Sequence, residues 1–474
     1  MKKFPAFIVS STLLVILAAC AEGGDDGEEA LPEEPAASEE TEDTEGTAEP
    51  EESEDSEGNE EEGSGDEVET GAVDTDTEAT GDEETVLEFW IHQTGEEETE
   101  AYIERIDAFN EEHDDIYVDA EVIIDDGASA YSDSINAALV AGNLPDIMAV
   151  DGPYVAAFAE SDVLQPIDDY IDDETIDGYV DSIIQQGTYQ DELYSLGSME
   201  ASVLLYYNKD LLEEHGIEPA HSLDEAWTWK ELHENAQELT TEDYYGLNLF
   251  MNEGVGEWLT FMGAPFIWSN GGELISEDGT EVEGYLNAEE SLEAFEYIQT
   301  LFEDGVVSES PPETQFQEGE AAMALGGPWV GGMADDAGLN WGIMPYPYAD
   351  EKYSPSGSMA YGVTSNSEHP EEAAELMKWM TNKESTIRVA EATGMPPAQE
   401  AAFEELDRFD DLPWSIMEEQ VVETAKARPS TPAYPVLTDA FAETFHAAAL
   451  GEDYESVANQ QIQRVERELR RFQD

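Results

Sequence analysis

Basic side chains are scarce in this chain of 474 residues, where 16 Lys and Arg face 115 Asp and Glu and give a formal net charge of −99. A nucleic-acid-binding protein needs Lys and Arg to neutralise phosphates, so the balance argues against that class. The same shortage disfavours electrostatic docking to an anionic membrane surface. Hydrophobic residues make up 40 % of the chain. That is enough for a packed core, and the length suggests two or three domains.

Cysteine occurs once, at Cys20. Residues 1–19 are predicted to be a signal peptide, because two lysines precede the mostly apolar run Phe7–Leu17, which is too short to span a membrane comfortably. The sequence Leu17-Ala18-Ala19-Cys20 resembles the lipobox of bacterial lipoproteins, which implies acylation of Cys20. The alternative is a plain secretory signal with a chance cysteine. Without a second cysteine, disulfides and thiolate metal sites are excluded from the folded part.

Aromatic and basic residues are absent from residues 21–84, which hold 30 acidic residues. Such a segment buries too little apolar surface to offset its ordering entropy, so residues 20–84 are predicted to be a lipidated cysteine followed by a disordered acidic tether. Residues 85–474 keep 85 acids and 14 bases, and 14 − 85 = −71. High salt screens the self-repulsion of so acidic a domain, which favours a halophilic protein that works in brine. The alternative is an acidic extracellular protein from an alkaline or ordinary habitat.

Strand and helix patterns alternate from residue 85 onward. Strands are expected near residues 85–90, 116–124 and 147–150, with helices between them at 97–113 and 131–141. This order is typical of βαβ units on a parallel sheet. A second α/β region follows, with a strand expected at 203–207 and a helix that begins at Asn208. Further helices are expected at 227–239, 288–303 and 371–381.

Catalytic signatures are missing. The chain has no HExxH, GxSxG or Walker A sequence, and no GxGxxG after a strand. Adjacent carboxylates such as Asp168-Asp169 are expected by chance in so acidic a chain. The seven histidines are scattered, so no metal site and no cofactor are predicted.

Tryptophans beside glycines are the first positive signal. Trp268 precedes Ser269-Asn270-Gly271-Gly272, and Trp329 lies within Gly326-Gly327-Pro328-Trp329-Val330-Gly331-Gly332. Glycines leave a ring face open to a ligand, and an apolar ring suits the C–H face of a sugar. The alternative is that both rings are core. Arg428, in a segment bounded by prolines, is the second signal, because the N–H groups of a guanidinium can bind hydroxyls or a carboxylate in a fixed geometry. The alternative is that Arg428 forms a structural ion pair.

An ordered set of short motifs resembles the family 1 extracellular solute-binding proteins, the sugar receptors of ABC importers, including the maltose- and trehalose-binding proteins. The first motif is Leu204-Leu205-Tyr206-Tyr207-Asn208-Lys209-Asp210-Leu211-Leu212. The others, in chain order, are Pro145-Asp146-Ile147 with Asp151, Trp227–Leu232, Asn270-Gly271-Gly272, Phe316–Met323, Gly327-Pro328-Trp329, His369–Ala373 and Arg428-Pro429. The resemblance covers nearly all of residues 85–474.

The resemblance implies an α/β fold of the two-lobe periplasmic-binding-protein type (type II), with a hinge and a ligand cleft between the lobes. The chain is expected to cross between lobes near Gly197 and near Ser358. Lobe one is therefore predicted over residues 85–197 and 359–405, and lobe two over residues 198–358 and 406–474.

The resemblance also implies roles for individual residues. Asp151 matches an acid that accepts hydrogen bonds from hydroxyls, Trp329 a stacking aromatic and Arg428 a sugar-binding arginine. The loop after the first strand, with His92, Gln93 and Glu98, matches a polar loop that faces the ligand. Where some disaccharide receptors carry Tyr and Asp before the Leu204–Tyr207 run, this chain has Met199 and Ala201, with Glu200 between them. Where they carry a tryptophan after a late glycine pair, it has Met359. The predicted ligand-binding set is His92, Gln93, Glu98, Asp151, Glu200, Trp268, Trp329, Met359 and Arg428.

The function implied is that of a lipid-anchored receptor on the extracellular face of a bacterial membrane, not an enzyme. It is expected to bind carbohydrate as a monomer and to deliver it to an ABC permease with its ATPase subunits, without nucleic acid and with membrane contact through the lipid only. Two alternatives stay open. The ligand could be another solute, such as a polyol phosphate, or the protein could be a secreted glycoside hydrolase, which needs two carboxylates across a sugar.

Overall fold

The computed structural model describes residues 70–72, 85–93, 96–124, 130–357 and 359–472. All of these residues belong to one compact unit, Asp66–Asp474. The predictions for the signal peptide, for Cys20 and for most of the acidic tether therefore lie outside the described residues.

Six strands form the first sheet, in the order β1-β3-β2-β4-β13-β7. β2 runs parallel to β3 and β4, as successive βαβ units require. β13 runs antiparallel to both β4 and β7. Side chains alternate along β2, so that Leu87, Phe89 and Ile91 are fully buried. The strands are β1 (Thr70–Ala72), β2 (Thr85–Gln93), β3 (Ile116–Ile124), β4 (Ile147–Asp151), β7 (Ser195–Gly197) and β13 (Met359–Val363).

The edge strand β1 lies within the segment predicted to be a tether. It pairs antiparallel with β3, with Thr70 opposite Ile123 and Ala72 opposite Glu121. Residues 70–73 carry no charge, and β3 without β1 would present an open edge with unpaired backbone groups. The structure therefore differs from the predicted continuous tether at this segment.

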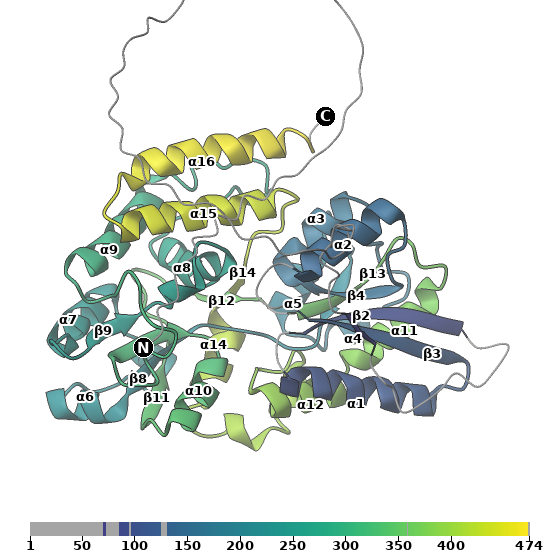
Figure 1. Ribbon diagram of the computed structural model, residues 1–474, viewed down its shortest axis with the longest axis horizontal. Coiled ribbons are helices and arrows are strands. Elements are labelled where there is room, and N and C mark those ends of the chain that lie inside the picture. The colour runs from purple at the N-terminus through teal and green to yellow at the C-terminus, as the bar shows by residue number, and fades with distance from the viewer. Residues whose placement is uncertain (1–69, 73–84, 94–95, 125–129, 358, 473–474) are drawn as a thin grey trace, which may run out of the picture. The chain divides into compact units, whose positions relative to one another are not determined.

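Helices cover the first sheet and complete the first lobe (Figure 1). α1 packs against β2, β3, α11 and α12, with Ile106 and Phe109 fully buried on its apolar face. The helices of this region are α1 (Glu96–Glu112), α2 (Ala130–Ala141), α3 (Val155–Glu160), α4 (Asp173–Ile176), α5 (Asp181–Gly187), α11 (Pro370–Met380), α12 (Lys383–Thr393) and α13 (Glu400–Phe403). A two-stranded ribbon, β5 (Thr188–Tyr189) with β6 (Glu192–Leu193), follows α5.

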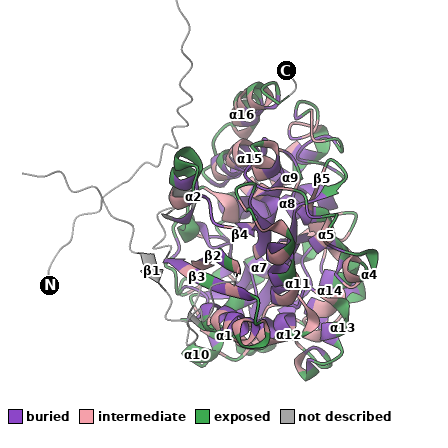
Figure 2. Ribbon diagram, turned by 90° about the vertical axis from the view of Figure 1, so that its right-hand side faces the viewer, coloured by how far each residue is buried: buried purple, intermediate pink, exposed green. Residues whose placement is uncertain are grey.

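Four strands form the second sheet, in the order β11-β8-β10-β9. Every residue of β8 and β10 is buried, as is usual for strands that are covered on both faces. The strands are β8 (Leu204–Asn208), β9 (Tyr245–Asn248), β10 (Ala321–Gly326) and β11 (Trp341–Met344). In Figure 2 the buried residues, in purple, gather inside the unit, and exposed residues, in green, mark the outer faces of the helices.

The second lobe is built from this sheet and its helices. α6 begins after Asn208, whose side chain accepts hydrogen bonds from the backbone of Asp210 and Leu211, as a helix N-cap does. α8 packs against α9 and α15, and α15 packs against α16 (Figure 1). The helices are α6 (Lys209–His215), α7 (Trp229–Leu239), α8 (Glu257–Ser269), α9 (Glu289–Glu303), α10 (Trp329–Ala337), α15 (Tyr434–Ala449) and α16 (Tyr454–Leu469).

Two segments connect the sheets. Residues 198–203, here the first linker, join β7 to β8, and residues 345–357, the second linker, lead from β11 towards β13. The second linker contains β12 (Ser354–Ser356), which pairs in parallel with β14 (Ala425–Ala427) after α14 (Ser415–Thr424). The chain thus passes from one sheet to the other next to the crossings predicted at residues 197 and 358. The full lobe boundaries stay a prediction.

Candidate functional site

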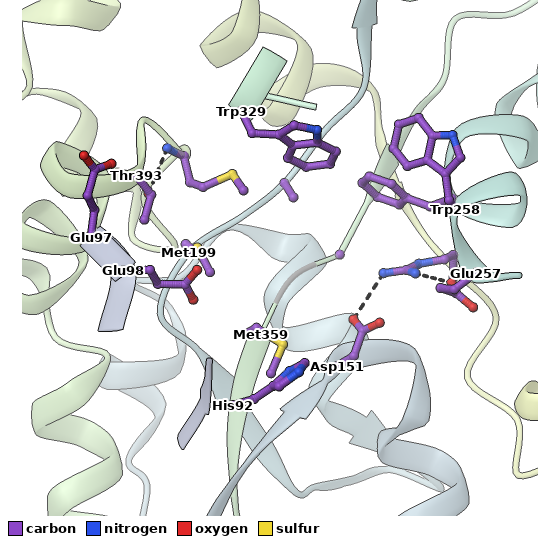
Figure 3. Close-up of a pocket in the computed structure, with 15 residues that line it drawn as sticks. His92, Glu97, Glu98, Asp151, Met199, Glu257, Trp258, Trp329, Met359 and Thr393 are labelled. Atoms are coloured by element: carbon purple, nitrogen blue, oxygen red, sulfur yellow. Dashed lines mark hydrogen bonds and ion pairs between the residues drawn. The ribbon is translucent and has the colours of Figure 1, made fainter. Parts of the chain in front are cut away.

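A cavity of about 800 Å³ is lined by residues from both lobes and from both linkers. Six of the nine predicted ligand-binding residues line it: His92, Glu98, Asp151, Trp329, Met359 and Arg428. Figure 3 shows the cavity, with Trp329 and Trp258 on one side and His92, Asp151 and Met359 on the other.

Strand ends of the first sheet supply one wall. His92 lies at the end of β2, and Asp151 is the last residue of the parallel strand β4. β13 runs in the opposite direction, so its first residue, Met359, pairs with Asp151 at the same edge of the sheet. Carboxyl ends of parallel strands are where open α/β sheets place their ligands.

Aromatic side chains contact two of the polar residues that line the cavity, His92 and Glu98. The His92 imidazole stacks on Tyr131, with 4.5 Å between ring centroids, and the Tyr131 hydroxyl donates to the carbonyl of Ala149 at 2.7 Å. Glu98, in the first turn of α1, accepts a hydrogen bond from the Tyr102 hydroxyl at 2.6 Å. Burial raises the pKa of Tyr102 well above its ordinary value, so the phenol keeps its proton and remains a donor.

Arg428 lies between two carboxylates at the cavity wall. Its Nη2 atom is 3.4 Å from Oδ1 of Asp151, and its Nη1 atom pairs with Oε1 of Glu257, as the dashed lines in Figure 3 mark. Glu257 opens α8 and accepts further hydrogen bonds from the hydroxyls of Tyr434 at 2.5 Å and Thr438 at 2.6 Å. This ion-pair cluster therefore ties the end of β4 in the first lobe to α8 and α15 in the second.

The electrostatics of the cluster keep Arg428 charged. Burial by itself lowers the pKa of the Arg428 guanidinium, but Asp151, Tyr434 and Glu257 together raise it by more. Burial raises the pKa of Glu257, and the charge of Arg428 opposes that shift. The predicted sugar-binding arginine is therefore at the site, but two carboxylates already balance its charge.

Gly357 leaves the space that Arg428 fills. A Cβ atom at this position would stand 2.1 Å from Arg428 Nη2, and the residue has a φ of +149°, where glycine is favoured. Only glycine at position 357 therefore allows the second linker to run this close to the guanidinium of Arg428.

Two tryptophans form the opposite wall. Trp329, the first residue of α10, is 40 % exposed, and its ring meets Trp258 edge to face with 5.8 Å between centroids. Trp258 Nε1 donates to the carbonyl of Leu249 at 3.0 Å, which fixes its ring. Gly327 makes room for the other ring, since a Cβ atom there would lie 2.1 Å from the Trp329 indole. The glycine-flanked tryptophan of the sequence is thus an accessible ring at a cavity.

Three predicted residues do not line the cavity. Gln93 follows His92 on β2, and successive side chains of a strand point to opposite faces. Trp268 is only 2 % exposed and belongs to the second hydrophobic core. Its prediction is wrong because α8 is buried on every side from Leu259 to Ser269, and Gly271, with a φ of +81°, serves the turn that follows this helix.

Glu200 is the third, and it belongs to the hinge instead. Its carboxylate is fully buried and accepts hydrogen bonds from the amides of Ala201 and Gly357, both at 2.8 Å, and from the hydroxyl of Ser356 at 2.9 Å. The Ser182 hydroxyl of α5 donates to it as well. Glu200 therefore joins the two linkers, and the prediction of a ligand contact is corrected.

The cavity also contains residues that the sequence did not mark as a site. Glu257, Trp258 and Phe261 come from the first two turns of α8 and Gly357 from the second linker. Thr393 is the last residue of α12, and Met395 follows that helix. Met199 and Ala201, noted only as departures from the family pattern, line it as well. The one sequence feature that could have marked the start of α8 as part of the site is Glu257 followed by Trp258 at the beginning of an apolar run.

Two negative findings concern the described residues alone. No helix among them has the length and apolar character that crossing a membrane requires. In the same part of the chain, no group of His, Cys, Asp and Glu side chains has the arrangement of a metal site.

Two α/β lobes, two linkers and a cavity lined from both lobes define a two-lobe solute receptor. The family described as bacterial extracellular solute-binding protein matches residues 95–387, more than half of the chain, and the chain belongs to this family. The family resemblance and the two-lobe α/β fold expected from the sequence are thereby confirmed.

Relatives with known roles include the maltodextrin-binding protein MdxE of Bacillus subtilis (strain 168). It is 25 % identical over 409 residues, which cover 83 % of this chain and 92 % of the relative. The maltotriose-binding protein of Pyrococcus abyssi (strain GE5 / Orsay) is 26 % identical over 267 residues, or 54 % of each chain.

Solved structures share the fold. The cyclic alpha-maltosyl-1,6-maltose binding protein from Arthrobacter globiformis matches with a TM-score of 0.70 and 24 % identity, over 81 % of this chain and 99 % of the other. The sugar-binding protein MalE from Xanthomonas citri matches with a TM-score of 0.70 and 19 % identity, over 82 % and 98 %.

Proposed function

We propose that this protein is the extracellular receptor of an ABC importer and that its ligand is a carbohydrate. The observation that carries the proposal is the accessible ring of Trp329 across the cavity from the polar side chains of His92 and Asp151 (Figure 3). A ring face suits the C–H face of a sugar, while carboxylate and imidazole groups bind its hydroxyls. The volume of about 800 Å³ lies within the usual range of small-molecule sites.

The ligands of the relatives support the same ligand class. Maltodextrin, maltotriose and galactooligosaccharide are the ligands named for three of them. We extend that class, though not a particular sugar, to this chain, and we propose that the protein binds without turning its ligand over.

The anchor and the partners complete the proposal. The Leu17–Cys20 sequence and the acidic segment after it support acylation of Cys20 and display on the extracellular face of a bacterial membrane. From there a monomeric receptor delivers its ligand to a permease and the ATPase subunits that drive it.

The charge of residues 85–474, 14 − 85 = −71, supports work in brine. At about 1 M salt the Debye length falls to about 3 Å, so repulsion between surface carboxylates is strongly screened. The melting temperature of the protein is expected to rise as NaCl increases from 0.1 M to about 2 M. A melting temperature that is unchanged or falls over this range would exclude adaptation to brine.

A thermal-shift screen tests the function. The protein, in about 2 M NaCl, is heated with mono-, di- and oligosaccharides, polyols and glycerol 3-phosphate. A ligand that is present at 1,000 times its Kd stabilises the folded state by about 4 kcal/mol. We expect a sugar to raise the melting temperature and to be recovered unchanged afterwards. No shift with any sugar would reject the carbohydrate assignment, and cleavage of the bound sugar would identify a hydrolase.

A polyol phosphate is the second candidate, because the sn-glycerol-3-phosphate-binding periplasmic protein UgpB of Pectobacterium atrosepticum is 24 % identical over 351 residues. The charge of the cavity argues against a polyol phosphate as ligand. Among the described lining residues Arg428 is the one Lys or Arg, and it is paired with Asp151 and Glu257. Nothing there is left to balance a dianion.

A further inference from the structure

A second cavity adjoins the proposed ligand site. This side chamber has a volume of about 240 Å³ and shares Trp258 and Trp329 with the main cavity. Its other lining residues are Phe250, Glu253, Glu313 and Met333. A ligand that rests on the two shared rings therefore has room to extend a substituent into the chamber.

Three aromatic rings wall the side chamber. Phe250 meets Trp258 edge to face with 6.0 Å between centroids, and Trp258 meets Trp329 in the same way at 5.8 Å. The face of an aromatic ring is negative and its edge is positive, so an organic cation in this space is attracted wherever it lies against a ring face.

The backbone at Phe250 is held in an unfavourable conformation. Phe250 has a φ of +51°, in the left-handed region that bulky residues avoid. Its amide donates to Oδ1 of the fully buried Asn248 at 2.7 Å, which holds the turn. Strain of this kind gathers at ligand-binding sites, where surrounding contacts maintain it.

The charge of the side chamber is negative. Glu253 and Glu313 contribute carboxylates, and none of the described residues that line the chamber is basic. Beside it, Gln317 donates to the sulfur of Met333 at 3.4 Å, while its own Oε1 atom is buried without a partner among the described residues. The general acidity of the chain accounts for exposed carboxylates, but it does not account for the three aromatic side chains that line the same space.

We propose that the side chamber binds the ammonium group of a cationic ligand, and that the carried solute is therefore an amino sugar, alone or within an oligosaccharide. This step rests on the proposed carbohydrate function. Carboxylates of Glu253 and Glu313 attract the ammonium, and the rings of Phe250, Trp258 and Trp329 contact it. A quaternary ammonium solute shares this chemistry and is separated from an amino sugar by the experiment.

Isothermal titration calorimetry of the full chain at pH 7 and constant high salt tests the proposal. The ligands are glucosamine, N-acetylglucosamine, glucose and tetramethylammonium chloride, with maltotriose and the free-amine and N-acetylated β-1,4-glucosamine trimers. We expect the free amines to bind about tenfold more tightly than their N-acetylated forms, since a cation–π contact and a nearby carboxylate contribute on that scale.

The variant Glu253→Gln with Glu313→Gln keeps the shape of the side chamber and removes its charge. We expect it to abolish the preference for the amine and to leave the affinity for neutral sugars unchanged. The matched control is Glu238→Gln with Glu242→Gln, two exposed carboxylates that line neither cavity. The control is expected to keep the preference.

Each outcome is decisive. Equal affinities for amine and acetamide, or a preference that survives in the double variant, would overturn the ammonium site, while binding of the neutral sugars would still support the receptor. Binding of tetramethylammonium without any sugar would keep the ammonium site and remove the carbohydrate. If none of these ligands binds, the ammonium site is overturned, and the thermal-shift screen with the wider panel decides the carbohydrate function.

Discussion

Asp151 and Arg428 form an ion pair at the cavity wall with 3.4 Å between Oδ1 and Nη2, although 277 positions separate them in the sequence. Asp151 ends β4 in the first lobe, and Arg428 follows β14. The same guanidinium also pairs with Glu257 of the second lobe. A cation shared in this way fixes how the two lobes approach each other at the cavity wall.

Replacing Arg428 by Ala is expected to destabilise the fold. The change leaves Asp151 and Glu257 close together without a cation, and breaking a buried pair in this manner costs about 3–5 kcal/mol. Urea unfolding in high salt measures the loss. Arg388→Ala is the control, because its pair with Glu104 is largely exposed and contributes about 1 kcal/mol at most.

A triple variant separates lost charge balance from lost packing. Arg428→Met with Asp151→Asn and Glu257→Gln removes all three charges and is expected to recover most of the stability. If the triple variant is as unstable as Arg428→Ala, the packing of the guanidinium against Phe261, 4.8 Å from its ring centroid, outweighs the ion pairs.

The two glycine-flanked tryptophans are expected to differ in their effect on binding. Trp329→Ala removes an exposed ring from the cavity and should weaken sugar binding by about 1–3 kcal/mol, the range of aromatic hot spots. Trp268→Phe changes a ring in the core and should lower the free energy of unfolding without altering affinity. Calorimetry with the sugar found in the screen decides, and unchanged affinity in a folded Trp329→Ala protein would remove this ring from the site.

Gly357→Ala is expected to cost about 2 kcal/mol or more of stability, because its Cβ atom would collide with Arg428 and its φ of +149° disfavours other residues. Gly332→Ala is the matched control. It lies inside α10, and its Cβ atom would meet nothing within 4 Å, so it should leave stability unchanged or raise it by about 0.5–1 kcal/mol. Equal effects at both positions would contradict the close approach of Arg428.

Glu200 is expected to make stability depend on pH. Burial raises its pKa in the folded protein, although its hydrogen bonds oppose that shift. The folded state therefore binds the proton more tightly than the unfolded state. This contribution is complete below the pKa of an ordinary Glu and is lost as the pH rises through the raised pKa of Glu200.

Glu200→Gln copies the protonated form and should cancel this part of the pH profile. The free energy of unfolding of the wild type minus that of Glu200→Gln is therefore expected to fall as pH increases from 4 to 8. Glu200→Ala leaves two amides and two hydroxyls without an acceptor and should cost about 3 kcal/mol or more at every pH. A difference that stays constant with pH would show that Glu200 is not perturbed by burial.

Much of the fold was readable from the sequence, since strand and helix patterns in regular alternation define the first lobe. Three site residues, His92, Asp151 and Met359, followed from the family resemblance, and the structure places all three at strand ends on one edge of the sheet. The Gly327-Pro328-Trp329 sequence identified an accessible ring for a local reason, the space that a glycine leaves beside an indole.

What the sequence could not show depends on distant contacts. Trp268 and Trp258 share one apolar helix, and only packing buries the first and exposes the second to the cavity. Glu200 was predicted as a ligand contact because it lies between Met199 and Ala201, where some disaccharide receptors carry sugar contacts. Four donors from two linkers and α5 instead hold its carboxylate in the interior. Partners 157 positions apart, such as Glu200 and Gly357, leave no local pattern.

The carboxylate of Glu200 has a mechanical consequence. It is bonded at once to Ala201 of the first linker and to Ser356 and Gly357 of the second, so a torsion in one linker is transmitted to the other. The two linkers could otherwise bend separately, but here both are hydrogen-bonded to the same carboxylate. Any rearrangement that separates the two linkers must therefore first break hydrogen bonds to this one buried carboxylate.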